Sequence, residues 1–417
     1  EQEGRSEDAD AEATLDVFGA VLGQAAELQR AAGGGQIVVD RATYLQTRGS
    51  CTFRALEVRL RGQAEVAGVY LALSELPLRK TRGIPGLQAG LVGRTAELAV
   101  LQRAVDGLAD GGGQMLLLSG EAGIGKSRLV AETRARRQEQ ALWLEGRCLE
   151  MTEAASYGPF LNALRDYFGW QLGVDEAVLA AAMREGLARL AAARLWDGET
   201  CAEIGAVLGR LYAVRFGAHL APGWDDRLAS AAPAELRHRT LAALRTLLAA
   251  IAHVQPLVLV LEDLHWADDA SLDLVNDLLP GIGSAPLLLL CVYRPLPEAR
   301  CSQLPVLAAR KCPAHYQELR LRELTPAESD QMVTALLEIE ALAPPTKSWI
   351  LERAQGNPYF TEESILALIE AGVIRRDAQV WRTTDPRDGA LADLEMPFSV
   401  DQLVATRVDR LPAPLRH

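Results

Sequence analysis

The sequence predicts an α/β fold in which a parallel β-sheet is covered by helices on both faces. Short, strongly apolar runs with the length of buried strands occur at 115–118, 257–261 and 287–292. Helical patterns separate them, and such alternation is typical of parallel sheets. The first run leads through a glycine-rich segment, 119–125, directly into a predicted helix. This strand–loop–helix unit is the strongest local signal in the chain.

The composition is that of a soluble chain with more than one domain. Its 417 residues allow two or three domains at about 150 residues each. Hydrophobic residues make up 49% of it, enough for buried cores, and no apolar run reaches the roughly 20 residues of a membrane helix. Six scattered cysteines, none in a C-x-x-C pair, indicate neither a disulfide framework nor a zinc site. A reduced, cytoplasmic location without a membrane partner is therefore expected.

The first predicted unit, residues 1–73, is a small α+β domain. Residues 74–90 follow it and are rich in proline, glycine and basic side chains, which is typical of an exposed linker. The chain begins with an acidic polar segment and no Met, so we interpret it as part of a longer protein. The elements expected in the first unit are a helix at 15–30, a strand at 36–39 and a hairpin formed by 55–60 and 66–73.

Residues 91–300 are expected to form the main α/β domain. It includes a helical insertion at about 169–230, to which the sequence assigns no chemistry. After Pro295 the chain is expected to be mostly helical. The predicted elements are helices at 95–108 and 127–140, strands at 115–118 and 141–144, an Ala/Leu-rich helical stretch at 159–252 with breaks near 198 and 222–223, and strands at 257–261 and 287–292.

The glycine-rich segment has the spacing of a phosphate-binding loop. Gly120–Ser127 is G-x-x-x-x-G-K-S between a predicted strand and a predicted helix, the setting that a P-loop requires. Glycines let backbone N–H groups surround a phosphate, and the helix start adds its positive dipole end. Lys126 is expected to contact the β- and γ-phosphates of ATP, and the Ser127 hydroxyl to bind Mg²⁺. The expected nucleotide-binding residues of this segment are Gly120, Glu121, Ala122, Gly123, Ile124, Gly125, Lys126, Ser127 and Arg128.

A second strand supplies acidic residues for such a loop. The apolar run Pro256–Leu261 ends in Glu262 and Asp263. In a chain with a P-loop, an acidic pair at this place is expected to hold Mg²⁺ and to polarise the attacking water. On its own the pair could also be an acidic helix cap. Because Glu262 stands where Asp is commoner, the two roles are assigned to the pair jointly.

Several motifs, in this order, resemble the STAND-class signalling ATPases of the AAA+ lineage. These ATPase modules are attached to bacterial cyclases, LuxR-type regulators and kinases. The resemblance spans about residues 91–411. The motifs are Leu91–Leu98 (LVGRTAEL), the loop Gly120–Ser127, Leu261–Asp268 (LEDLHWAD), Cys291–Pro295 (CVYRP) and Gln355–Phe360 (QGNPYF).

The resemblance implies further nucleotide contacts. Val92, Gly93 and Arg94 would lie against the adenine end of ATP. Arg294, after the next predicted strand, would act catalytically as a sensor of the γ-phosphate. The alternative for Arg294 is a surface arginine at a strand end.

The resemblance also implies a helical lid at 301–375. Gly356 and Pro358 would place this lid over the nucleotide, although the two residues are also compatible with a simple helix break. A strand pair is expected around Trp381. Residues 376–417 would then begin a winged-helix or arm segment.

Residues 1–73 resemble the C-terminal half of a class III nucleotide cyclase domain. In that family the helix carries an Asn and, four residues later, an Arg that stabilise the transition state. Aligned without gaps, these positions are Gly23 and Glu27, and Glu27 reverses the charge where phosphate would lie. A degenerate module is therefore expected, with a generic α+β fragment as the alternative. The resemblance rests on Val17–Gln29, Gly35–Asp40, Leu60–Glu65 and Val69–Tyr70.

Together these features favour a signalling switch that binds ATP and Mg²⁺ and hydrolyses ATP slowly. Protein signalling partners and nucleotide-dependent homo-oligomers are expected. A net charge of −12 and the lack of a basic helix-turn-helix pattern argue against direct nucleic-acid binding by this segment. The alternatives are a cyclase with an accessory ATPase, and an ATP-binding transcriptional regulator or scaffold whose output domain lies outside the chain.

Overall fold

The computed structural model describes most of the chain from residue 90 to residue 383. The predicted residues Gly23 and Glu27, most of the 74–90 linker and the 384–417 segment lie outside the described residues. The described ranges are 28–29, 32, 36–40, 43–44, 51–58, 67–75, 90–148, 156–169, 176–193, 195–212, 223–337, 342–377 and 380–383.

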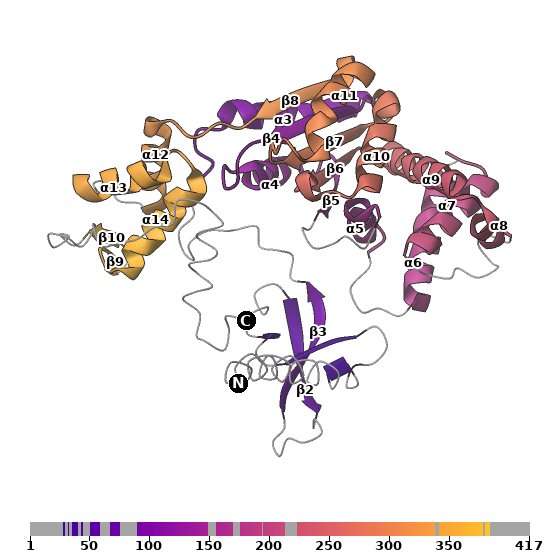
Figure 1. Cartoon of the computed structure of the whole chain (residues 1–417), viewed down its shortest axis with the longest axis horizontal. Coiled ribbons are helices and arrows are strands. Elements are labelled where there is room, and N and C mark those ends of the chain that lie inside the picture. Colours follow the sequence, from indigo (N-terminus) through magenta and orange to yellow (C-terminus); the bar gives the residue numbers. More distant parts are fainter. Residues whose placement is uncertain are drawn as a thin grey trace, which may run out of the picture.

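The centre of the molecule is a five-stranded sheet in which all neighbouring strands are parallel, in the order β5-β6-β7-β4-β8 (Figure 1). β4 and the glycine loop after it therefore lie inside the sheet, not at its edge. Since parallel strands all end at one edge, the loops after β4, β6 and β7 meet there. The predicted fold class is confirmed. The strands are β4 (Gln114–Ser119), β5 (Leu142–Arg147), β6 (Leu257–Glu262), β7 (Leu287–Tyr293) and β8 (Tyr316–Arg320).

Helices cover both faces of this sheet. Along β4, Met115 and Leu117 pack in one apolar cluster while Leu116 and Leu118 pack in another, because successive strand side chains point to opposite faces. All four are fully buried, which explains the uninterrupted apolar run in the sequence. On one face lie α3 (Thr95–Asp106) and α4 (Lys126–Arg137); on the other lie α5 (Gly158–Tyr167), α9 (Pro233–Val254), α10 (Asp269–Leu278) and α11 (Leu304–Lys311).

The helical insertion packs on α9 and extends the core of that face. The expected breaks near 198 and 222–223 coincide with helix starts at Gly198 and Trp224. Its helices are α6 (Glu176–Ala192), α7 (Gly198–Leu211) and α8 (Trp224–Ser230), and they share the apolar cluster of α9. Short 3₁₀ helices occur at Gly107–Asp110, Leu264–Trp266, Leu279–Ser284, Arg300–Gln303 and Pro313–His315.

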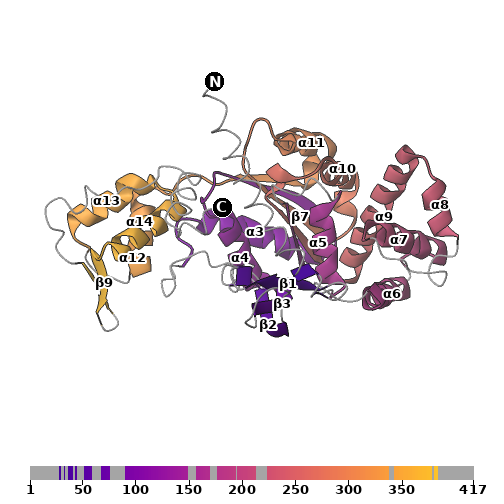
Figure 2. The ribbon, with the colours of Figure 1, turned by 60° about the horizontal axis from the view of Figure 1, so that its bottom comes forward.

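Of the expected lid, 301–375, the segments α11 and β8 pack with the central sheet, whereas the helices after them have a core of their own and are called the lid below (Figures 1 and 2). The lid contains α12 (Pro326–Leu337), α13 (Pro344–Ala354) and α14 (Pro358–Glu370), followed by the hairpin β9 (Ile374–Asp377) and β10 (Val380–Thr383). The hairpin confirms the strand pair expected around Trp381. Leu324, Trp349, Ile350 and Ile365 are among the side chains buried in this cluster.

One strand was not predicted. The region after Pro295 is mostly helical as expected, but Tyr316–Arg320 forms the edge strand β8 beside β4. Its sequence, Y-Q-E-L-R, has no buried side chain and therefore lacks the apolar run that marks the inner strands. Charged side chains on a short edge strand are also a common protection against pairing with other chains.

The N-terminal segments form a separate antiparallel sheet of order β1-β3-β2. Its strands are β1 (Ile37–Asp40), β2 (Cys51–Val58) and β3 (Ala67–Glu75), so β2 begins four residues before the predicted strand. Tyr44 stacks on Tyr70 with ring centroids 3.9 Å apart. The expected hairpin is confirmed, while the resemblance to a cyclase stays a prediction from the sequence. None of the helices in the described ranges is long and apolar enough to cross a membrane.

Candidate functional site

The glycine loop after β4 forms a cradle that opens into α4. Gly123 and Gly125 have φ values of 76° and 100°, which side-chain-bearing residues rarely adopt. Gly125 is the N-cap of α4, so the first helical turn begins at Lys126. The loop therefore presents a helix N-terminus at the carboxyl edge of the sheet, the arrangement that favours bound phosphate.

Lys126 is folded back over this cradle. Its Nζ donates hydrogen bonds to the carbonyls of Gly120 and Glu121, both at 2.8 Å. The side chain is only 8% exposed, and burial, with a smaller contribution from the positive charge of Arg294, lowers its pKa to about 8. A desolvated ammonium group held by two carbonyls is well placed to exchange them for phosphate oxygens.

The two predicted acids lie in different environments at the end of β6. Glu262 is 1% exposed, and its Oε2 accepts a hydrogen bond of 2.7 Å from Nη2 of Arg147. Its Oε1 is buried and has no hydrogen-bond partner among the described residues. Asp263 is more exposed, has a φ of 57°, and lies 3.4 Å from Nε of Arg147 through its Oδ2. Burial raises the pKa of Asp263, against the opposing effect of Arg147.

Arg147 is a site residue that the sequence interpretation missed. It is the last residue of β5 and is paired in register with Glu262 of β6. The available signal was positional: it ends the strand next to the acidic one, and parallel neighbours end together. Its single guanidinium compensates both carboxylates, which would otherwise be costly to bury side by side.

Arg294 follows β7 and faces the same site. Its guanidinium lies 5.7 Å from the centre of the Trp266 ring. Burial, together with the positive charges of Arg294 and Lys126, lowers the pKa of His265 to about 4, so this imidazole is neutral near pH 7. Lys126 after β4, the acidic pair at the end of β6 and Arg294 after β7 thus lie close together at the carboxyl edge of the sheet.

Oxygen ligands suited to Mg²⁺ are present in this place. The exposed hydroxyl of Ser127, the unpaired Oε1 of Glu262 and the Asp263 carboxylate are hard donors of the kind that Mg²⁺ prefers. Within the described ranges, no cluster of three or more His, Cys, Asp or Glu side chains could hold a metal ion by itself. An ion here would therefore complete its shell with nucleotide phosphates and water, as is usual for Mg²⁺.

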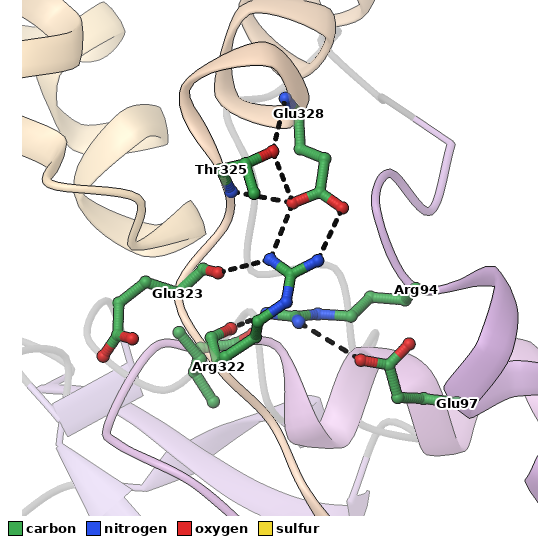
Figure 3. Close-up of polar contacts among 7 residues, drawn as sticks. Arg94, Glu97, Arg322, Glu323, Thr325 and Glu328 are labelled. Atoms are coloured by element: carbon green, nitrogen blue, oxygen red, sulfur yellow. Dashed lines mark hydrogen bonds and ion pairs between the residues drawn. The ribbon is translucent and has the colours of Figure 1, made fainter.

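The motif Leu91–Leu98 contacts the segment that follows β8 through Arg94 (Figure 3). Arg94 is 3% exposed and donates hydrogen bonds to the carbonyls of Ile124, at 3.5 Å, and Arg322, as well as to Glu97 at 3.4 Å. Gly93 has a φ of 66°, and a Cβ there would lie 2.7 Å from Cδ of Glu328. Arg94, which was expected with Gly93 at the adenine end of ATP, therefore contacts both the cradle and the connection between β8 and α12, residues 321–325, while Gly93 lies against Glu328 in the first turn of α12.

That connection is held by a compact ion-pair network (Figure 3). Arg322 donates to both carboxylate oxygens of Glu328 at 2.8 and 2.9 Å. Glu328 also accepts from the Thr325 N–H at 2.7 Å, while its own N–H donates to Oγ1 of Thr325 at 3.3 Å, which is a capping box at the start of α12. Arg322 is the main reason that the pKa of Glu328 falls to about 2. A cavity of about 210 Å³ beside the cradle is lined by Gly120, Glu121, Arg320, Leu321, Arg322 and Glu323.

The lid touches the cradle at the start of α14. Pro358 is the first residue of this helix, and the N-cap before it, Asn357, donates from Nδ2 to the Ala122 carbonyl at 2.9 Å. The Tyr359 N–H lies 3.3 Å from the Gly123 carbonyl. Gly356 accepts a hydrogen bond of 2.8 Å from Leu324 in the connection. Gly356 therefore contacts the connection, and the hydrogen bonds from this segment to the cradle come from Asn357 and Tyr359, the two neighbours of Pro358.

Arg128 lies on the side of α4 that faces the lid. Burial raises the pKa of Glu362 in α14 to about 7, and the positive charge of Arg128 opposes that rise. Arg128 is thus electrostatically coupled to the lid, a role that the expected nucleotide contact does not describe.

Comparison with known proteins agrees with this geometry. Residues 90–290 match the family described as the AAA ATPase domain. Over 283 residues the chain is 29% identical to an uncharacterized protein of Rhizobium meliloti, covering 67% of this chain and 26% of the relative. Residues 90–290 are therefore similar in sequence to AAA-type ATPase domains. The matched part of the chain spans about a quarter of the length of that relative.

Similar solved structures include two archaeal proteins. One is the Aeropyrum pernix ORC1 protein in complex with DNA, with a TM-score of 0.43 and 16% identity over 78% of this chain and 70% of that chain. The other is a STAND protein with a tetratricopeptide repeat sensor from Pyrococcus horikoshii, with a TM-score of 0.32 and 12% identity over 78% of this chain and 47% of that chain.

Replacing Arg147 with Ala should destabilise the domain, because Glu262 would remain buried without its cation. We expect the free energy of unfolding at pH 7 to fall by about 3 kcal/mol, measured by urea denaturation. Arg245→Ala is the matched control: Arg245 pairs with Asp277 at 2.6 Å on the surface, and its loss should cost less than about 1 kcal/mol. Equal losses in the two variants would contradict the assigned role of Arg147.

Proposed function

We propose that this chain is an ATP-binding, Mg²⁺-dependent signalling ATPase that acts as a nucleotide-controlled regulatory switch. The observation that carries the proposal is the meeting of three strand ends at one edge of the sheet. The cradle after β4, the acids after β6 and Arg294 after β7 lie together there. The lid contacts the same cradle.

The proposed roles follow from the environment of each side chain. Lys126 exchanges its two carbonyl partners for the β- and γ-phosphates of ATP. Ser127 and Glu262 supply oxygens to the Mg²⁺ shell, Glu262 through the oxygen that Arg147 leaves free. Asp263, more exposed and with a raised pKa, orients the attacking water. Arg294 stabilises negative charge at the γ-phosphate.

The switch role is supported by the contacts that link the site to the lid. Arg94 bonds both to the cradle and to the connection before α12, and Asn357 bonds to the cradle from α14. A nucleotide in this place would touch the core and the lid together, so ATP and ADP can favour different lid positions. Slow hydrolysis of ATP would then set how long the lid stays in the ATP-bound position. Protein signalling partners and a nucleotide-dependent homo-oligomer belong to the same proposal.

Lys126→Ala tests nucleotide binding. Because Lys126 supplies the charge that meets the phosphates, we expect the affinity for ATP to fall at least about 100-fold, measured by calorimetric titration with Mg²⁺ present. Lys311→Ala removes an exposed lysine that contacts the Asn276 carbonyl, and it should leave the affinity unchanged. A Lys126→Ala protein that binds ATP as tightly as the parent would refute the assignment of the cradle.

Glu262→Gln and Asp263→Asn test hydrolysis separately from binding. Both changes keep the side-chain shape but remove a carboxylate that would hold Mg²⁺ or orient water. We expect each variant to bind ATP and to release phosphate at least about 100-fold more slowly than the parent. Phosphate release at the parental rate in both variants would show that the acidic pair does not act in catalysis.

The affinity for ATP should also depend on pH through Lys126. Its pKa is lowered to about 8 in the free protein, and bound phosphates will raise it again. Above about pH 8, binding of ATP therefore requires Lys126 to take up a proton. The affinity is highest below about pH 8 and falls by up to about tenfold per pH unit above it. In Lys126→Arg the cation stays protonated, and we expect weaker binding with no such fall between pH 8 and 9.5. If the affinity of the parent protein for ATP stays the same from pH 8 to 9.5, the lowered pKa of Lys126 is contradicted.

A further inference from the structure

The backbone carbonyls of the cradle are bonded one after another. Those of Gly120 and Glu121 accept from Nζ of Lys126 at 2.8 Å. The next two are bonded from the lid: Ala122 accepts from Nδ2 of Asn357 at 2.9 Å, and Gly123 faces the Tyr359 N–H at 3.3 Å. Half of these acceptors therefore depend on the position of α14.

The hydrogen bond to the Ala122 carbonyl also fixes the direction of the next backbone donor, the Gly123 N–H. A trans peptide is planar, so its carbonyl and the following N–H point in opposite directions. With the Ala122 carbonyl held toward the lid, the Gly123 N–H points away from the lid, as a donor that serves a phosphate must. Gly123 has a φ of 76° and glycine can adopt many other conformations, so its own backbone preference does not hold this orientation.

Asn357 is itself held in place. Its Oδ1 accepts the Tyr359 N–H at 3.0 Å, which is the N-cap of α14, and this leaves Nδ2 directed at the cradle. The contact is also close: a Cβ at Gly123 would lie 2.6 Å from Cβ of Tyr359 and 2.9 Å from Oδ1 of Asn357. The lid is thus seated directly on the cradle backbone at this point.

We propose that Asn357 is a positioning residue that orients the Ala122–Gly123 peptide of the cradle from the lid. Lid docking and affinity for the phosphates of a nucleotide then rise and fall together, because the same amide group caps the lid helix and holds the cradle. This inference rests on the proposed function, since it assumes that the cradle binds nucleotide phosphates.

Asn357→Ser separates the two contacts of the side chain. Serine is as good an N-cap as asparagine, but its hydroxyl is too short to reach the Ala122 carbonyl as well. We expect the affinities for ATP and ADP both to fall about fivefold, the usual effect of losing one hydrogen bond. In the nucleotide-free protein, amide hydrogen exchange in a peptide covering 119–127 should become about fivefold faster, while exchange within α14 stays at the parental rate.

Asp197→Ser is the matched control. Asp197 caps α7 through the Thr200 N–H at 2.8 Å, in the helical insertion, and the change should alter neither the affinity nor exchange in 119–127. Parental affinity together with parental exchange in Asn357→Ser would overturn the inference. Faster exchange in α14 as well would also overturn it, because the substitution would then act through the helix.

The exchange measurement distinguishes this inference from the proposed function. If the parent binds no ATP, the proposed function fails, and faster exchange in 119–127 alone still supports the orienting contact of Asn357. If the parent binds ATP and Asn357→Ser leaves exchange in 119–127 unchanged, the inference about Asn357 fails and the proposed function stands.

Discussion

The parallel register of the central sheet is the constraint on which the site depends. β4, β5, β6 and β7 all run in one direction, so their last residues meet at one edge although they come from distant parts of the chain. The cradle, Arg147, Glu262 and Arg294 each follow or end one of these strands. The continuous apolar pattern that buries each strand on both faces therefore also determines where its terminal polar residue lies.

Charge balance is the second feature that shapes the site. Lys126, Arg147 and Arg294 lie near Glu262 and Asp263, and the Glu121 carboxylate also acts on Lys126, so three cations stand against three carboxylates. Arg147 makes the burial of Glu262 tolerable, while Lys126 is desolvated enough that its pKa falls to about 8.

The lid is joined to this edge by contacts that all pass close to the cradle. Arg94 links Ile124 to the connection before α12, and Glu328 both caps α12 and pairs with Arg322. Asn357, the N-cap of α14, adds a hydrogen bond to the Ala122 carbonyl of the cradle. The cradle and the lid are therefore linked mainly by side chains that bond to backbone carbonyls of the other segment.

Much of the main domain was predictable from local patterns. The apolar runs of β4, β6 and β7, the spacing of Gly120–Ser127 and the acids after β6 all carry their signal within about ten residues, and the structure places each in the expected element. β8 was missed because an edge strand with polar side chains has no such pattern. The start of β2 was missed by four residues, as strand boundaries depend on pairing with β3.

By itself the sequence determined the inner strands β4, β6 and β7, the glycine loop and the position of the acidic pair, because the signal of each lies in residues adjacent in the chain. Only the tertiary structure decided which groups those residues meet. The bond between Arg147 and Glu262 joins positions 115 residues apart, and that between Ala122 and Asn357 joins positions 235 residues apart. Both follow from strand register and lid docking, which bring distant segments together in ways that no local spacing encodes.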